Sequence, residues 1–135
     1  MQEEIILTGD FNAKHDMWEA GAKPCAKGKA IATELYTSKL ILLNNGQKTT
    51  IPDINRASSA IDLSFATRGI ATKTSWSVIQ EEFGSTHFSI LIDLQLAPPI
   101  CQDKKSKSEL KESDRENQQY STPIHIRSGR ITVYI

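Results

Sequence analysis

Short apolar runs divide the first hundred residues into candidate strands at 4–8, 40–43, 60–66, 75–79 and 88–96. The first run ends at Gly9-Asp10 and the second at Asn44-Asn45-Gly46, both turn-forming sequences. Between them, residues 28–39 place Ile31 and Leu35 four positions apart beside small alanines, which predicts a short amphipathic helix. Strands interleaved with a helix favour a layered α/β domain.

The pattern changes after Pro98-Pro99. Residues 102–119 hold five basic and five acidic side chains and one aliphatic residue, Leu110, too little apolar surface to offset the entropy of ordering. Residues 123–135 alternate again around Ser128-Gly129, which predicts a hairpin with Ile126 opposite Ile131 and Ile124 opposite Val133. We therefore predict a domain at 1–97, a disordered linker at 98–122 and a β-hairpin at 123–135.

Composition narrows the function only slightly. Lys plus Arg and Asp plus Glu number 16 each, so no global field draws the chain to nucleic acid or to a membrane. Cys25 and Cys101 lie far apart without the spacing of a zinc site. The N-terminus lacks the features of a signal peptide, and the longest apolar runs are strand-sized. These features favour a nuclear or cytoplasmic protein without a membrane span.

Three polar clusters at strand ends or within strands could carry chemistry. Asp10 and Asn12 follow the first run, Asp62 interrupts the apolar run 60–66, and His87 precedes the last strand. Each has a structural interpretation as well. Asp10 or Asn12 could cap its own turn, Asp62 could point to solvent by strand alternation, and His87 could be a surface residue.

Taken together and in order, the motifs resemble the endonuclease/exonuclease/phosphatase superfamily, and most closely the apurinic-type endonuclease domain of insect-type non-LTR retrotransposons. The matching segments are Gly-Asp-Phe-Asn-Ala at 9–13, Lys-His-x-x-Trp at 14–18, Leu-Asn-x-Gly at 43–46, Ser-Ala-Ile-Asp-Leu at 59–63, a Trp-x-Val strand at 76–78 and a closing motif at 85–87. The resemblance covers about residues 3–96. It implies the C-terminal half of this fold, a partial α/β sandwich followed by a mainly disordered tail.

The resemblance also implies roles for the polar clusters. Asp10 would orient or activate the attacking water, and Asn12 would help to hold the scissile phosphate of DNA. Asp62 would fix the tautomer and orientation of His87, which would stabilise charge on the phosphorus oxygens. A divalent ion, normally Mg²⁺, would polarise the phosphate and neutralise the leaving oxygen.

Two further residues of the motif are candidates for substrate contact. Lys14 could touch the DNA backbone. Trp18 could stack on the substrate, although a tryptophan at such a position is more often part of the core.

Two departures from the family pattern bear on activity. The closing motif is Ser-Asp-His in the family and Ser85-Thr86-His87 here, so a neutral hydroxyl stands where a carboxylate serves the metal environment. Asp10 is then a weak metal ligand whose usual partner position is Thr86. The family also places an Asn and a metal-binding Glu in an N-terminal half-domain, which we expect to be missing. We expect the remaining half to supply roughly one sheet, with an apolar face uncovered.

Three functional hypotheses follow. The chain is an endonuclease fragment, complete only with a further half-domain; or a non-enzymatic remnant of a mobile element; or a nucleic-acid-binding fragment. Thr86 and the expected truncation favour an inactive chain. The neutral charge and the lack of a basic stripe count against a dedicated binding module.

Overall fold

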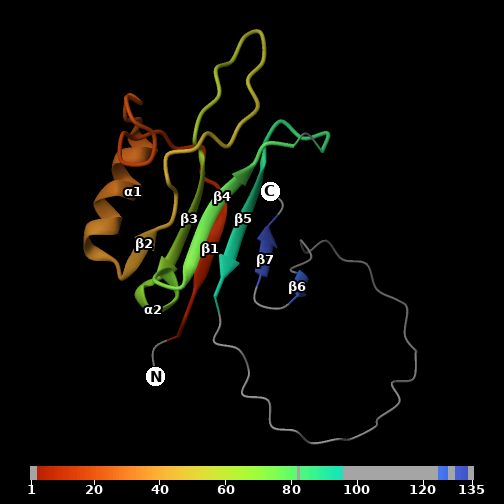
Figure 1. Cartoon of the computed structure of the whole chain (residues 1–135). Coiled ribbons are helices and arrows are strands. Elements are labelled where there is room, and N and C mark those ends of the chain that lie inside the picture. Colours follow the sequence, from red (N-terminus) through yellow and green to blue (C-terminus); the bar gives the residue numbers. More distant parts are fainter. Residues whose placement is uncertain (1–2, 82, 96–124, 128–129, 134–135) are drawn as a thin grey trace, which may run out of the picture.

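The computed structural model describes residues 3–81 and 83–95, together with the main chain of two C-terminal strands, at 125–127 and 130–133. Its elements follow the alternation seen in the sequence (Figure 1). They are β1 (Ile6–Asp10), α1 (Ala26–Thr37), β2 (Leu40–Leu42), β3 (Asp62–Thr67), α2 (Arg68–Ala71), β4 (Thr74–Ile79), β5 (Ser89–Leu94), β6 (His125–Arg127) and β7 (Arg130–Val133). The mixed helices and antiparallel sheets confirm the α/β fold class.

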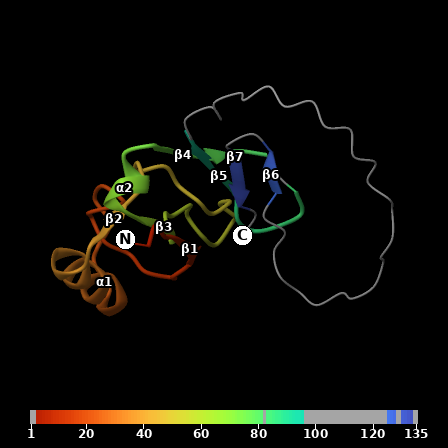
Figure 2. The same cartoon turned by 90° about the horizontal axis from the view of Figure 1, so that it is seen from below.

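The strands form two antiparallel sheets. The first has the order β1-β3-β2 and the second the order β4-β5-β7-β6. Helix α1 covers the outer face of the first sheet, and the second sheet packs against its other face, so the layers run helix, sheet, sheet (Figures 1 and 2). The expectation of roughly one sheet is therefore wrong. The physical reason is that the chain leaves β3 through the short α2 and continues as β4 in the second layer.

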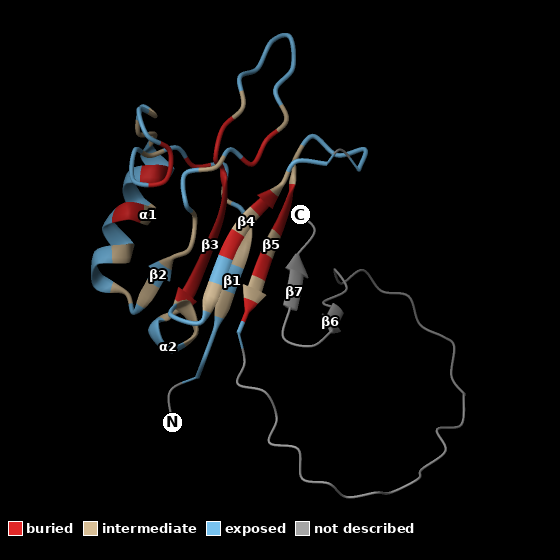
Figure 3. Cartoon of the chain, viewed as in Figure 1, coloured by how far each residue is buried: buried red, intermediate tan, exposed pale blue. Residues whose placement is uncertain are grey.

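Strand β3 is the centre of the domain because both of its faces are covered (Figure 3). Leu63 and Phe65 point toward α1, in a core that includes Trp18 and Ala32. The alternate residues face the second sheet, where the indole N–H of Trp76 donates to the Ser64 hydroxyl at 3.0 Å. The apolar side chains Leu63 and Phe65 thus lie on the α1 side of β3, whereas the polar Asp62 and Ser64 lie on the face toward the second sheet.

The core between the two sheets is apolar. It is built from pairs across β4 and β5, Trp76 opposite Ile92 and Val78 opposite Ile90, all of them buried. Partly buried side chains from the first sheet and the loops complete it: Ile6, Leu43 and Phe88.

The C-terminal strands pair as a hairpin with Ile126 opposite Ile131, the register that the sequence predicts. The hairpin is not separate from the domain, because β7 pairs along β5, with Val133 opposite Ile90 and Ile131 opposite Ile92. An isolated two-stranded hairpin is marginal in water, and addition to an existing sheet supplies the pairing it needs. The predicted linker at 98–122 lies outside the described residues.

Candidate active site

Three acidic or imidazole side chains meet at one end of the first sheet. Asp10 ends β1 and Asp62 begins β3, and the antiparallel register places the two directly opposite each other. His87 comes from the loop before β5 and forms an isolated β-bridge to Thr50, in the loop between β2 and β3. Ligand atoms of Asp10, Asp62 and His87 all lie within 4.8 Å of one another.

His87 is held by the buried carboxylate of Asp62. Its Nδ1 lies 2.8 Å from Asp62 Oδ2, and the Asp62 side chain has no exposed surface. A carboxylate at this distance favours the Nδ1–H tautomer, which donates to it and leaves Nε2 on the open side. Burial of Asp62 excludes the interpretation that it points to solvent.

Asp10 stands on the open side of the imidazole. Its Oδ2 lies 3.9 Å from His87 Nε2, too far for a direct hydrogen bond. A gap of this length between two polar atoms suits an intervening water or phosphate oxygen. The Asp10 side chain is 43% exposed and the His87 side chain 18% exposed, so the gap is reached from solvent.

The turn after β1 uses the other oxygen of Asp10. Asp10 Oδ1 accepts the main-chain N–H of Asn12 at 2.8 Å, and Asn12 adopts a left-handed conformation with φ of 45°. Asp10 therefore caps its own turn and faces His87 at once, so the structural and functional interpretations of this motif are compatible. Asn12 is exposed beside the cluster.

The two candidate substrate contacts differ in exposure. Lys14 is exposed. Trp18 is only 1% exposed, and its indole N–H donates to the Ala13 carbonyl at 3.1 Å. A ring enclosed in this way has no face for a base, so the assignment of Trp18 to substrate binding is wrong and its core interpretation holds.

Thr86, at the position where the family pattern has an Asp, is exposed next to His87. Its carbonyl accepts the N–H of Ile51 at 2.9 Å. This hydrogen bond fixes the main chain of Thr86 beside His87, and the Thr86 side chain offers a neutral hydroxyl in place of a carboxylate.

One buried polar atom in the cluster has no hydrogen-bond partner among the described atoms: Oδ1 of Asp62. A buried carboxylate oxygen is costly without a proton donor or a cation. Two carboxylates and an imidazole are suitable ligands for a divalent ion, and Mg²⁺ needs only one or two protein carboxylates when waters and phosphate oxygens complete its shell. The residues present therefore fit a metal ion.

Sequence reasoning missed the residues that hold Asp62 in place. The Asn44 amide donates to the Asp62 carbonyl at 2.9 Å and accepts the Ser64 N–H at 2.8 Å. The Thr49 hydroxyl accepts the N–H groups of Ile61 and Asp62. Asn44 had a signal, since it belongs to the Leu-Asn-x-Gly motif, but Thr49 had none.

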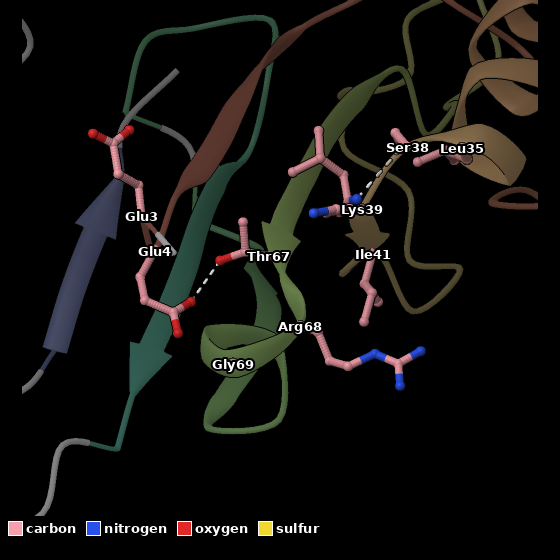
Figure 4. A pocket seen from close by; sticks show the side chains of 10 residues that line it. Glu3, Glu4, Leu35, Ser38, Lys39, Ile41, Thr67, Arg68 and Gly69 are labelled. Carbon is pink, nitrogen blue, oxygen red and sulfur yellow. Dashed lines mark hydrogen bonds between the residues drawn. The ribbon is translucent and has the colours of Figure 1, made fainter. Parts of the chain in front are cut away.

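A groove of about 720 Å³ is drawn in Figure 4, and the residues that line it do not include Asp10, Asp62 or His87. The groove lies at the end of the first sheet where β1 begins and β3 ends, opposite the end that carries Asp10 and Asp62. Glu3 and Glu4 are its two acidic residues, and Glu4 accepts from the Thr67 hydroxyl at 2.6 Å and from the Ile70 N–H at 3.1 Å.

The layered α/β fold and the carboxylate–imidazole cluster at its strand ends define a domain of the endonuclease/exonuclease/phosphatase class. A family model described as endonuclease-reverse transcriptase matches residues 1–91, and the chain belongs to this family of retrotransposon-type endonucleases. No curated protein and no solved structure matches it. None of the helices in the described part of the chain has the length and apolar character that a bilayer crossing requires.

Proposed function

We propose that the Asp10–Asp62–His87 cluster is the active site of a metal-dependent endonuclease domain that hydrolyses the phosphodiester bond of DNA. The observation that carries the proposal is the meeting of three segments distant in sequence around one solvent-accessible gap. The family match supports a nucleic-acid substrate.

The geometry supports the roles that the family resemblance implies. Asp62, buried and bonded to Nδ1, fixes the ring of His87 so that Nε2 faces the gap. When both ring nitrogens of His87 carry protons, the Nε2–H donates to a phosphate oxygen as negative charge grows on it. Asp10 Oδ2, across the gap, accepts a hydrogen bond from the attacking water and orients it.

Asn12 and Lys14 serve substrate binding in this proposal. Both are exposed and follow Asp10 directly in the chain. The Asn12 amide donates to a phosphate oxygen without adding charge, and the Lys14 ammonium pairs with a neighbouring phosphate of the DNA backbone.

The metal ion belongs next to Asp10. Asp62 Oδ2 is engaged by His87 and Asp62 Oδ1 is buried, so Asp10 Oδ2, on a partly exposed side chain, is the carboxylate oxygen best placed to bind an ion from solvent. A divalent ion held by Asp10 would polarise the phosphate and neutralise the leaving oxygen.

We propose further that this ion is held weakly. Thr86 brings no charge to the position where the family has a carboxylate, and a hard cation is strongly hydrated. The shell would be completed by a carboxylate from an N-terminal half-domain of the same fold. With Thr86 in place of a carboxylate, we expect little or no nicking activity, and a role as a non-enzymatic remnant of a mobile element is the second candidate.

Conversion of supercoiled plasmid to open circle tests the proposal. In Mg²⁺ or Mn²⁺, we expect the purified chain to nick no faster than His87→Ala, the control for contaminating nuclease. Thr86→Asp alone should not restore nicking, because one added carboxylate leaves the shell incomplete. Metal-dependent nicking by the unchanged chain that disappears in His87→Ala would contradict the proposed weakness and establish a functional half-site.

A further inference from the structure

We infer that Thr49 is a positioning residue that holds Asp62 and His87 in contact, although its own side chain touches neither the gap nor solvent. The meaning of the Asp62–His87 pair for catalysis rests on the proposed function. The positioning itself rests on hydrogen bonds that Thr49 makes in two opposite directions.

Toward Asp62, Thr49 acts through its side chain. Thr49 is fully buried, and its Oγ1 accepts the N–H of Ile61 and the N–H of Asp62, each at 3.2 Å. These two amides lie at the start of β3, where the Asp62 carboxylate points toward the second sheet. A buried N–H without an acceptor is costly, so the hydroxyl fixes the main chain of Asp62 and with it the direction of the carboxyl group.

Toward His87, Thr49 acts through its main chain. Its carbonyl accepts the N–H of Phe88 at 2.8 Å, and Thr50 forms the β-bridge to His87. On the other side of that bridge, Ile51 N–H donates to the Thr86 carbonyl at 2.9 Å. His87 is thereby fixed from both of its neighbours by the segment that contains Thr49.

Thr49 thus connects the two partners of the pair within one residue. His87 and Asp62 lie 25 positions apart in the sequence, on elements that belong to different sheets or their loops. Packing alone sets such a contact loosely, whereas polar groups that bond to both segments set its distance. Removal of the Thr49 hydroxyl leaves the hydrogen bond from Phe88 N–H to the Thr49 carbonyl intact, but it removes the acceptor of the Ile61 and Asp62 N–H groups.

The adjacent Thr50 provides a matched control. It is as buried as Thr49, at 1% exposed, but its Oγ1 accepts the N–H of Ser59 at 2.8 Å and not that of Asp62. Thr49→Val and Thr50→Val therefore remove the same buried hydroxyl group from neighbouring positions. Only the first change reaches Asp62 directly.

The experiment uses NMR of the full chain to observe the ring of His87, with Asp62→Ala to identify the signal of the unpaired ring. In the unchanged chain we expect the Nδ1–H tautomer, with a downfield proton bonded to a carboxylate. Thr49→Val should lose this downfield proton signal, as Asp62→Ala does. Thr49→Ser, which restores the hydroxyl, and Thr50→Val should both keep it.

Retention of the signal in Thr49→Val would overturn the inference, and so would its equal loss in Thr50→Val, which would indicate general core damage. If Thr49→Val does not fold, loss of the signal in Thr49→Ser, or fast exchange of the Ile61 and Asp62 amide protons in the unchanged chain, would overturn it instead. The readout needs neither metal nor DNA. A failure of the nuclease proposal therefore leaves this result interpretable on its own.

Discussion

At the scale of single residues, Glu19 shows how the polar surroundings of the site are held. It is 8% exposed, its Oε2 accepts the N–H of Ala60 at 2.8 Å, and its Oε1 pairs with the ammonium of Lys48. Burial raises the pKa of Glu19, but the hydrogen bond from Lys48, the amide of Ala60 and the charges of Lys48 and Lys14 outweigh it and lower the pKa below its ordinary value of 4.5. The ionised form thus ties the loop after β1 to the entry of β3.

Glu19→Ala should destabilise the chain by about 1–3 kcal/mol, because the buried Ala60 amide loses its acceptor. Glu19→Gln keeps an oxygen for that amide and should cost less. Urea unfolding measures both, with Glu34→Ala on the exposed surface of α1 as the control within about 0.5 kcal/mol of the unchanged chain. Equal stability of Glu19→Ala and Glu34→Ala would contradict the role of Glu19.

The same residue sets a pH dependence with a definite sign. A carboxyl group whose pKa is lower in the folded chain adds stability above its unfolded pKa, here near 4.5, and loses it as the pH falls through the folded value. Acidification from neutral pH to below 4.5 should therefore narrow the stability difference between the unchanged chain and Glu19→Gln.

The identity of the site residues was within reach of the sequence, and their surroundings were not. Asp10, Asp62 and His87 stand in recognisable motifs, so their meeting could be expected. The burial of Asp62 could not be predicted from the sequence of β3 alone. Strand alternation places Asp62 on the face opposite Leu63, and that face is buried only because the second sheet covers it. Thr49 was unpredictable because its partners are ten or more positions away.

At the scale of elements, the Lys-His-x-x-Trp loop is docked on the N-terminal turn of α1. The Lys14 carbonyl accepts the N–H of Cys25, the N-cap residue, whose sulfur accepts the N–H of Gly28 at 3.4 Å. The close approach needs a glycine. A Cβ at Gly28 would lie 1.9 Å from the Lys14 carbonyl oxygen.

Gly28→Ala should therefore destabilise the chain, although alanine favours a helix interior by about 1 kcal/mol over glycine. The clash is with main-chain atoms that cannot move without displacing the loop after Asp10. Gly69→Ala in α2 is the matched control, because its Cβ would meet the flexible carboxyl end of Glu4, at 2.1 Å, which can turn away. Thermal unfolding should give a lower midpoint for Gly28→Ala than for Gly69→Ala, and the reverse order would refute the docking.

The element boundaries were predicted to within about two residues, and two of the differences have a physical reason. The apolar pattern ends the first strand at residue 8, but β1 continues to Asp10. Its last two residues remain in the strand because they pair with Leu63 and Asp62 of β3. The helix likewise begins at Ala26, two residues before the apolar period, since Cys25 caps it.

At the scale of the whole molecule, the chain contributes to both layers of the sandwich. Apolar periodicity located the strands but did not assign them to sheets, and a single sheet was expected because half of a two-sheet fold was expected to supply only one. The assignment depends on the crossing through α2 and on the contact of Trp76 with Ser64, neither of which leaves a periodic signal. The domain boundaries at 97 and 122 remain predictions.

Paramagnetic broadening by Mn²⁺ tests the central claim most directly, namely that Asp10, Asp62 and His87 form a metal and phosphate site. In a millimolar titration, the amide signals of Asp10, Asn12 and His87 should broaden first and recover when excess Mg²⁺ is added. Asp10→Asn should abolish this selectivity. Broadening that is no stronger at Asp10 than at the exposed Asp53, or that persists unchanged in Asp10→Asn, would contradict the account.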